Sequence, residues 1–344
     1  MKKVSLKLTK GQVKAIISVA VSAVVVCTLF VINLFFPLKY AGTYLVVRSS
    51  SPSDGMYIHI LDVGQADCTI IEFPDGKNML IDGGDGTYTC TYGIIKTLNG
   101  LGIDTIDYLV CTSVNSEHCG GLADIISVKD VSVIYYPYCK NIYFNDNYHD
   151  FYTAASESGA EMIISEYGVG AEGGEGETEY FFTFLSPSVH TNEQGEYYAM
   201  NTYATDENID NASAILWLEC GGKGVFYASD AQYSVLSQVV DSYSFYEDNG
   251  LGSYFSYGGH TVDFSDCVLY KVAGHGSDDC LCGGLTTLLS PDISVISYGG
   301  DNSEGCPSVD VLTNLYRYGV IFLTQYDEDI TIKINSDGAS RTDY

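Results

Sequence analysis

Residues 112–121 read TSVNSEHCGG and directly follow Asp107–Cys111, a run typical of a strand. Three other polar segments also follow strand-like runs: LIDGG (Leu80–Gly84), YASD (Tyr227–Asp230) and AGHGS (Ala273–Ser277). Loops at strand ends are where side chains from distant parts of a chain converge. Asp, Glu and His are the ligands that a hydrolytic metal ion needs. The segments therefore predict one site at the ends of several strands.

Strand-like and helix-like segments alternate in two series, on either side of residue 211. Strands are expected at Tyr57–Leu61, Thr69–Phe73, Asn78–Ile81, Asp107–Cys111, Val131–Tyr136, Ala214–Glu219, Val225–Tyr227, Val268–Val272, Ile293–Ser297, Val320–Leu323 and Ile330–Ile334, and helices at Tyr92–Leu98, Gly120–Ile126, Gln232–Val240 and Val309–Tyr318. Such alternation predicts an α/β domain of two similar halves.

In this order the segments resemble the metallo-β-lactamase fold and, within it, the extracytoplasmic domain of ComEC-type competence proteins. That branch opens with LDVGQGD, matched by LDVGQAD at Leu61–Asp67, and continues with a Pro-Asp-Gly turn and LIDGG, both present. Its motif THxHxDHxGG corresponds to residues 112–121. Its later Gly-Asp, HHGS and GHPS segments correspond to Ser229-Asp230, Gly274–Ser277 and Gly305–Ser308. The resemblance implies a four-layer αββα sandwich over residues 56–336.

The metal motif departs from the family pattern at two positions. The first metal position of the family uses both histidines of HxH, and these are Ser113 and Asn115 here. Neither is a good ligand for zinc, which prefers imidazole, thiolate or carboxylate. The resemblance implies that the second position is kept by four residues: Glu117, His118, Asp230 and His275.

This pattern leaves two outcomes open. In the first, one divalent metal ion, zinc or manganese, lowers the pKa of a bound water, and the protein is a mononuclear hydrolase of phosphodiesters. Asp82 and Glu117 are then the expected catalytic residues, with Asp82 orienting a ligand or the water. In the second, the protein is a pseudoenzyme that serves as a binding or scaffold module at the cell envelope.

Each of these residues also has an ordinary structural explanation. His118 could end a helix and only make hydrogen bonds, and His275 could lie in a surface turn. Asp82 could cap a turn, and Asp230 could cap the helix that follows it. Their order along the chain matches that of the family, and this resemblance favours convergence on one site.

Five further residues stand in or near the motifs. Cys119 and Cys306 are expected to be buried thiols or disulfide partners, although a thiolate at Cys306 could replace a histidine of the family. Gln65 and Asp67 are expected to hold the first pair of strands together. Asn211 lies where the family often has an asparagine near the cleft, and it is expected to form a hydrogen bond there.

Ala15–Phe36 contains 22 uncharged and mostly apolar residues, enough to cross a membrane. Five lysines and no acidic residue precede it, so we expect residues 1–14 in the cytoplasm and the main domain outside. A cleaved signal peptide is the alternative, although its apolar core is normally shorter. Residues 37–55 are expected to be a linker and residues 337–344 a C-terminal tail.

The net charge limits the partners that are expected for this domain, and the cysteine content limits its possible disulfides. Beyond the first 14 residues the formal charge is −33, because five of the 16 basic residues lie there and all 44 acidic residues follow. Strong binding to nucleic acid is therefore not expected, and the expected partners are a membrane, through the apolar helix, and a phosphodiester substrate. Ten of the 11 cysteines follow the anchor, and they could form disulfides or remain as thiols.

Overall fold

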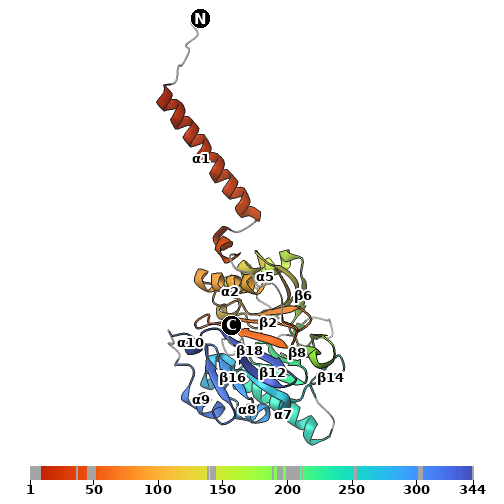
Figure 1. Ribbon diagram of the computed structural model, residues 1–344. Coiled ribbons are helices and arrows are strands. Elements are labelled where there is room, and N and C mark those ends of the chain that lie inside the picture. Colours follow the sequence, from red (N-terminus) through yellow and green to blue (C-terminus); the bar gives the residue numbers. More distant parts are fainter. Residues whose placement is uncertain are drawn as a thin grey trace.

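The computed structural model describes residues 9–35, 38–44, 52–137, 139, 145–187, 190–191, 197–198, 210, 212–250, 254–300 and 305–342. Asn211, which was expected to form a hydrogen bond near the cleft, lies outside the described residues. Figure 1 shows one long helix that projects from a layered body in which two sheets lie between two groups of helices.

The first sheet contains the strands of the N-terminal half and the last two strands of the chain. Their bounds are Met56–Ile60 (β1), Thr69–Glu72 (β2), Asn78–Ile81 (β3), Thr105–Val110 (β4), Asp130–Tyr136 (β5), Glu161–Ile164 (β6), Ile330–Asn335 (β18) and Gly338–Thr342 (β19). Their order is β19-β18-β1-β2-β3-β4-β5-β6, and β3 to β6 run parallel.

The second sheet is built mainly from the C-terminal half. Its strands are Gly170–Gly173 (β7), Tyr180–Ser186 (β8), Ile215–Cys220 (β11), Lys223–Tyr227 (β12), Cys267–Lys271 (β15), Ile293–Ile296 (β16) and Val320–Leu323 (β17). Their order is β17-β16-β15-β12-β11-β8-β7, and β12, β15, β16 and β17 run parallel. Two short hairpins lie outside the sheets: His190–Thr191 (β9) with Tyr197–Tyr198 (β10), and Ser256–Tyr257 (β13) with His260–Thr261 (β14).

Helices cover the outer face of each sheet. The helices of the first half are Tyr88–Leu101 (α2), Ser116–Cys119 (α3), Leu122–Ile126 (α4) and Asp146–Ser158 (α5), and those of the second half are Tyr233–Asp248 (α7), Gly283–Leu289 (α8), Val309–Leu315 (α9) and Thr324–Asp327 (α10). Short 3-10 turns are Leu38–Tyr44 (η1), Gly176–Thr178 (η2), Phe264–Asp266 (η3), Ala273–Gly276 (η4) and Asp278–Cys280 (η5).

Side chains that alternate between the two faces of each strand explain the four layers. In β12, Val225 and Tyr227 face the core between the sheets, whereas Phe226 faces the core under α7, α8 and α9. In β3, Met79 and Ile81 face the core between the sheets and Leu80 faces the core under α2, α4 and α5. Successive strand side chains point to opposite faces, and strands covered on both faces read as continuous apolar runs. The predicted four-layer αββα sandwich is thus confirmed.

Capping residues set the ends of α2. The Thr87 side chain accepts a hydrogen bond from the Cys90 backbone N–H at the start of the helix, and Gly102 ends it with φ 77°. Such a left-handed residue satisfies the last carbonyls of a helix, and glycine adopts it without strain. The helix therefore begins four residues earlier than the predicted Tyr92 and packs along the first sheet.

The two ends of the chain differ from the sequence expectations. The N-terminal helix α1 spans Lys10–Phe35, beyond the predicted Ala15–Phe36 at its start, and its apolar side chains are exposed, with Val19 at 70% and Phe30 at 65%. It is long and apolar enough to span a membrane. The predicted linker, residues 37–55, contains η1, and the predicted C-terminal tail, residues 337–344, contains β19. That segment forms a strand because Gly338 lets the chain turn back onto β18.

Candidate metal centre

The parallel strands bring the four polar segments to one edge of the sandwich. Asp82 directly follows β3 and Thr112 follows β4, while Asp230 follows β12 and His275 follows β15. The carboxyl ends of parallel strands lie at the same edge of a sheet, and this edge is where sites form in α/β folds. Because the two sheets face each other, loops from both meet there.

Glycine pairs allow two of these loops to touch through their backbones. A Cβ atom on Gly121 would collide with the carbonyl oxygen of Gly83, and one on Gly83 would lie 2.8 Å from Leu122. The Gly83 backbone N–H donates to the carbonyl of His118 over 2.7 Å. The LIDGG and TSVNSEHCGG segments therefore need glycine at these positions to bring Asp82 and His118 together.

His118 lies at the centre of the site and has no exposed surface. Its Nδ1 atom is 2.8 Å from Asp82 Oδ2 and its Nε2 atom is 2.7 Å from Asp230 Oδ2. Carboxylates only accept hydrogen bonds, so both ring nitrogens carry a proton in this arrangement. Burial alone would lower the pKa of His118, but the Asp230 and Asp82 carboxylates outweigh it and raise that pKa well above its usual value.

Asp82 is held in place by the strand next to it. Its two carboxylate oxygens accept hydrogen bonds from the Thr112 backbone N–H, over 2.8 Å, and from the Thr112 hydroxyl, over 2.6 Å. Its φ of 63° is in the left-handed region, which a non-glycine residue seldom adopts outside sites that constrain it. Burial raises the pKa of Asp82, against the opposing effect of His118. Asp82 therefore orients the His118 ring.

His275 offers a free nitrogen to Asp230. Its Nδ1 atom is 2.9 Å from the Ser297 carbonyl oxygen, which can only accept, so in the neutral ring Nδ1 carries the proton and Nε2 has the lone pair. His275 Nε2 is buried without a hydrogen-bond partner, and Asp230 Oδ1, 4.0 Å away, is equally without one. Two buried acceptors that face each other leave room for a cation between them.

Asp67 is the fourth acidic or imidazole group of the cluster. Its Oδ1 atom forms a 2.6 Å ion pair with Lys271 Nζ, and both side chains are buried. Its Oδ2 atom has no hydrogen-bond partner. One ligand atom from each of Asp67, His118, Asp230 and His275 lies within 4.8 Å of the others. Two carboxylates and two imidazoles are a donor set that suits zinc or manganese, so these residues fit a divalent metal ion.

The predicted ligands are only partly brought together. His118, Asp230 and His275 share the cluster, whereas Glu117 is not among the four residues whose ligand atoms converge. The Glu117 backbone carbonyl accepts a hydrogen bond from the Asp67 N–H over 3.1 Å, and its side chain lines the cleft beside the cluster. Asp67 was expected only to hold the first strand pair, although the LDVGQAD segment that contains it was the available signal.

A hydrogen-bonded network surrounds Asn115, one of the two residues that align with the family's first metal position. Asn115 Nδ2 donates to Asp210 Oδ1 over 2.9 Å, and Gln232 Nε2 donates to Asp210 Oδ2 over 3.0 Å. Burial and the neighbouring Asp230 raise the pKa of Asp210 to about 6. Ser113 is buried and its hydroxyl accepts from the Asn115 N–H over 3.3 Å. Nothing in the sequence motifs pointed to Asp210 or Gln232.

A polar cleft of about 780 Å³ opens onto the cluster. Asp230 and His275 lie at its inner end, and Glu117, Asn115 and Asp210 are among the residues of its wall. Asp67 and His118 do not line it, so the cluster is accessible from the side of Asp230 and His275. A site for hydrolysis needs such an open side, because water or substrate must reach the metal ion.

The cysteines have no part in the cluster. No disulfide joins the cysteines of the described residues. Cys119 is buried in the core under α2, α4 and α5, and burial raises its pKa to about 12. Cys306 is buried and lines the cleft, together with Cys280. Gln65, near Asp67, accepts a hydrogen bond from the Gly299 N–H over 3.2 Å and so connects the β1–β2 loop to the chain after β16.

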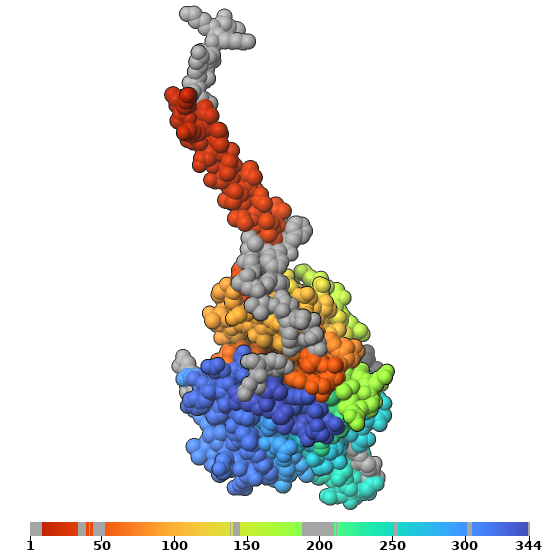
Figure 2. All heavy atoms as spheres, viewed as in Figure 1, coloured from red at the N-terminus to blue at the C-terminus, as the bar shows by residue number. Residues whose placement is uncertain are grey.

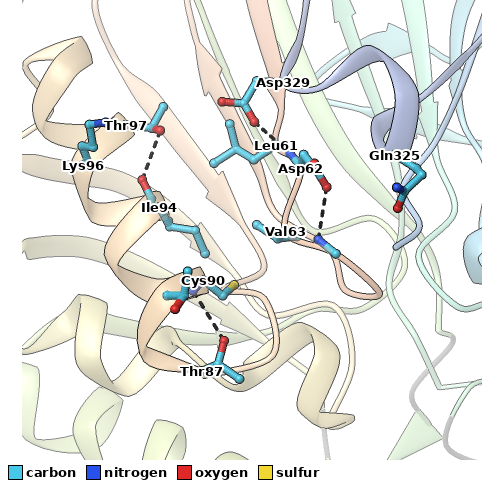
Figure 3. Close-up of a pocket in the computed structure, with 13 residues that line it drawn as sticks. Leu61, Asp62, Val63, Thr87, Cys90, Ile94, Lys96, Thr97, Gln325 and Asp329 are labelled. Carbon is cyan, nitrogen blue, oxygen red and sulfur yellow. Dashed lines mark hydrogen bonds between the residues drawn. The ribbon is translucent and has the colours of Figure 1, made fainter. Parts of the chain in front are cut away.

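A second cavity, of about 600 Å³, lies between α2 and the loop that follows β1 (Figure 3). Figure 3 shows Asp62 and Asp329 on one side and Cys90, Ile94 and Thr97 of α2 on the other. The Asp62 N–H donates to Asp329 Oδ1 over 2.8 Å. None of the four clustered residues lines this cavity.

The sandwich and its buried cluster define a protein with the metallo-β-lactamase fold. Residues 61–195 match the sequence model of the metallo-β-lactamase superfamily. The superfamily match and the buried Asp/His cluster together indicate a site for a divalent metal ion. A comparison with curated protein sequences gave no match.

Several solved structures are similar to this chain at low sequence identity. A CmlA β-hydroxylase mutant is 11% identical with a TM-score of 0.45, over 83% of this chain and 55% of that chain. Unliganded yeast PDE1 is 11% identical with a TM-score of 0.44, over 78% of this chain and 97% of that one. A long form RNase Z from yeast is 10% identical with a TM-score of 0.45, over 83% and 42%. The chain thus spans about half the length of the hydroxylase and less than half of the RNase Z.

Proposed function

We propose that this protein is a membrane-anchored hydrolase that uses a single divalent metal ion, zinc or manganese, to cleave phosphodiesters outside the cytoplasm. The observation that carries the metal site is the pair of buried acceptors without partners, His275 Nε2 and Asp230 Oδ1, 4.0 Å apart at the inner end of the cleft. Their unused lone pairs would cost several kcal/mol without a cation or water between them.

Residues around the cluster hold the ligands in the state that metal binding requires. Asp82 keeps the proton of His118 on Nδ1, so that Nε2 points to the metal position, and the Ser297 carbonyl does the same for His275. This carboxylate–histidine arrangement fixes the tautomer and increases the basicity of the ligand. The proton that lies between His118 and Asp230 would be lost when a metal ion binds.

The metal ion would supply a water of lowered pKa as the nucleophile. The protein would supply the open side of the site, where Asp230 and His275 meet the cleft, and polar groups that contact the substrate there, with Asp210 and Asn115 on the wall. Lys271 neutralises one oxygen of Asp67 and so limits the negative charge of the ligand set. With only two carboxylates, Asp67 and Asp230, among the four ligands, the ion would keep enough positive charge to polarise a phosphodiester.

Membrane anchoring is supported by the length and apolar surface of α1 and by the five lysines before residue 15. The phosphodiester substrate is supported by the resemblance to the ComEC-type domain and by the names of two similar structures, PDE1 and RNase Z. The acidic surface argues against a long nucleic acid as that substrate.

A second candidate function is that of a metal-free binding module. The observation that favours it is the Asn115–Asp210–Gln232 network, which satisfies the polar groups at the first metal position without an ion. In that case the cleft would bind a ligand at the cell envelope and would not hydrolyse it.

The metal content of the purified full-length protein tests the two candidates. We expect one equivalent of zinc or manganese after dialysis, and manganese- or zinc-dependent hydrolysis of bis-p-nitrophenyl phosphate. Asp230→Asn should abolish both, while Glu117→Gln, a matched change in the same cleft, should keep the metal. A chain that takes up no metal at any concentration of either ion would support the binding module.

A further inference from the structure

The segment between the apolar helix and the sandwich is docked on the sandwich. In η1, Tyr40 is fully buried and its hydroxyl donates to Asp124 Oδ2 over 2.7 Å. Lys39 Nζ forms an ion pair with the same oxygen over 2.6 Å. Asn99 Nδ2 of α2 donates to the buried Thr43 hydroxyl over 2.6 Å. These contacts join η1 to both α2 and α4.

Aromatic residues of α2 complete this contact. The Tyr88 ring stacks on Tyr40 with 6.1 Å between ring centroids, and its hydroxyl donates to the Lys39 carbonyl over 3.0 Å. A Cβ atom on Gly42 would lie 2.8 Å from the Tyr92 hydroxyl, so glycine is needed for this close approach. Because side chains from both sides are buried, η1 is part of the folded domain and does not act as a free tether.

The distance from the apolar helix to this contact is short. α1 ends at Phe35 and η1 begins at Leu38, so at most three Cα–Cα steps, about 11 Å, separate them. Figures 1 and 2 show that α1 leaves the body on the side of α2, and that α7 to α9 lie on the opposite side. If α1 spans a membrane, the layer that contains α2 and α4 must therefore lie next to that membrane.

We infer that the outer surface of α2 around η1 lies on the lipid headgroups of the leaflet that α1 enters; this rests on the proposed membrane anchoring. Tyr88 is 56% exposed there, and Thr89 and Lys96 are exposed on the neighbouring side of the same helix, which borders the second cavity. Tyrosine and lysine are the side chains that suit the headgroup region, because each combines an apolar body with a polar or charged end. The helical layer, about 10 Å thick, separates the headgroups from the sheets that carry the cleft.

Quenching of tryptophan fluorescence by headgroup-labelled nitroxide lipid in vesicles tests this orientation with the full-length protein. The natural Trp217 is fully buried and contributes a constant background. Thr89→Trp and Lys96→Trp place a reporter on α2, and Tyr316→Trp, at a residue 82% exposed next to α9, is the matched control. We expect several-fold stronger quenching of the two α2 reporters than of the control.

Equal quenching at all three positions, in protein that resists alkaline extraction from the vesicles, would overturn the orientation and leave the anchoring intact. Extraction of the protein by alkali would overturn the anchoring itself. A second change isolates the docked segment: Tyr40→Ala should reduce quenching at Thr89→Trp toward the control value while the domain stays folded. Unchanged quenching in that variant would show that η1 does not set the orientation.

Discussion

The two metal positions that the family resemblance implies for the segment TSVNSEHCGG differ chemically in this chain. At the second position, His118 meets Asp230 and lies near His275, and buried acceptors remain without partners. At the first, Ser113 and Asn115 replace imidazoles, and Asn115 is satisfied by Asp210. A few residues therefore separate a cluster with unpartnered buried polar atoms from a network whose amide and carboxylate groups are hydrogen-bonded to one another. The difference shows that Asn115 can be hydrogen-bonded to Asp210 while His118, Asp230 and His275 still form a compact cluster beside it.

The largest expected effect is the restoration of the first position. The double substitution Ser113→His and Asn115→His places two imidazoles where the network now lies, with Asp210 as a nearby carboxylate. We expect the zinc content to rise from one to two equivalents per chain, as measured by elemental analysis. Gln232→Ala, which removes another member of the network, is the control and should leave the stoichiometry at one. No gain in the double variant would mean that the surrounding loops exclude the ion.

Lys271 forms a buried ion pair with Asp67, one of the four clustered residues, and this pair is expected to stabilise the folded domain. Lys271→Met leaves the Asp67 carboxylate buried and unpaired, which costs about 3–5 kcal/mol of unfolding free energy. Urea unfolding of the metal-free protein measures this loss. Adding Asp67→Asn to the same variant should recover most of it. A single variant as stable as the wild type would show that the ion pair is not needed for folding.

Asp82 is not one of the four clustered residues, and it affects the second metal position through its hydrogen bond to His118. Asp82→Asn keeps a side chain that tolerates the φ of 63° but removes the carboxylate that orients the ring. We expect metal affinity to fall by roughly 10–100-fold, as for other residues that orient a ligand. Competition with a chromophoric chelator measures the change. Asp62→Asn, in the second cavity, is the matched control and should not alter the affinity.

Substitution of Asp210 is expected to give the smallest change in unfolding free energy, and that change depends on pH. Its folded pKa is raised from 3.8 to about 6, so the folded protein binds the proton more tightly and loses stability as pH rises through that range. Asp210→Asn should therefore stabilise the metal-free protein at pH 7 by about 1 kcal/mol, a figure reduced for the partial exposure of the group. The gain should disappear at pH 4, where both unfolding free energies are compared. A gain at both pH values would point to packing and not to charge.

Sequence patterns predicted most of the fold. Strand-like runs such as Thr69–Phe73 predicted the positions of strands, and the family resemblance carried by the order of the motifs predicted the αββα sandwich, which is confirmed. The strand β19 was missed because its sequence, GASRT, lacks the apolar residues by which strands are recognised. It forms because β18 offers an edge to pair with.

The candidate site was predictable to a smaller extent. The family resemblance carried by the motifs led to Asp82, His118, Asp230 and His275, all of which lie at one edge of the sheets. The place of Glu117 could not be predicted, because a residue next to a ligand points in another direction once the short helix α3 forms. Asp210 was missed because its partners come from distant segments.

The sequence alone determined the apolar helix, the two α/β halves and the four loops that carry acids and imidazoles, because these depend on local composition and on period. Only the tertiary structure decided which carboxylate shares the cluster, which nitrogen of His275 is free, and that the chain after α1 is buried against α2. The physical reason is that pairing, burial and tautomer are set by contacts between residues far apart in the chain, such as the 204 positions between Asp67 and Lys271.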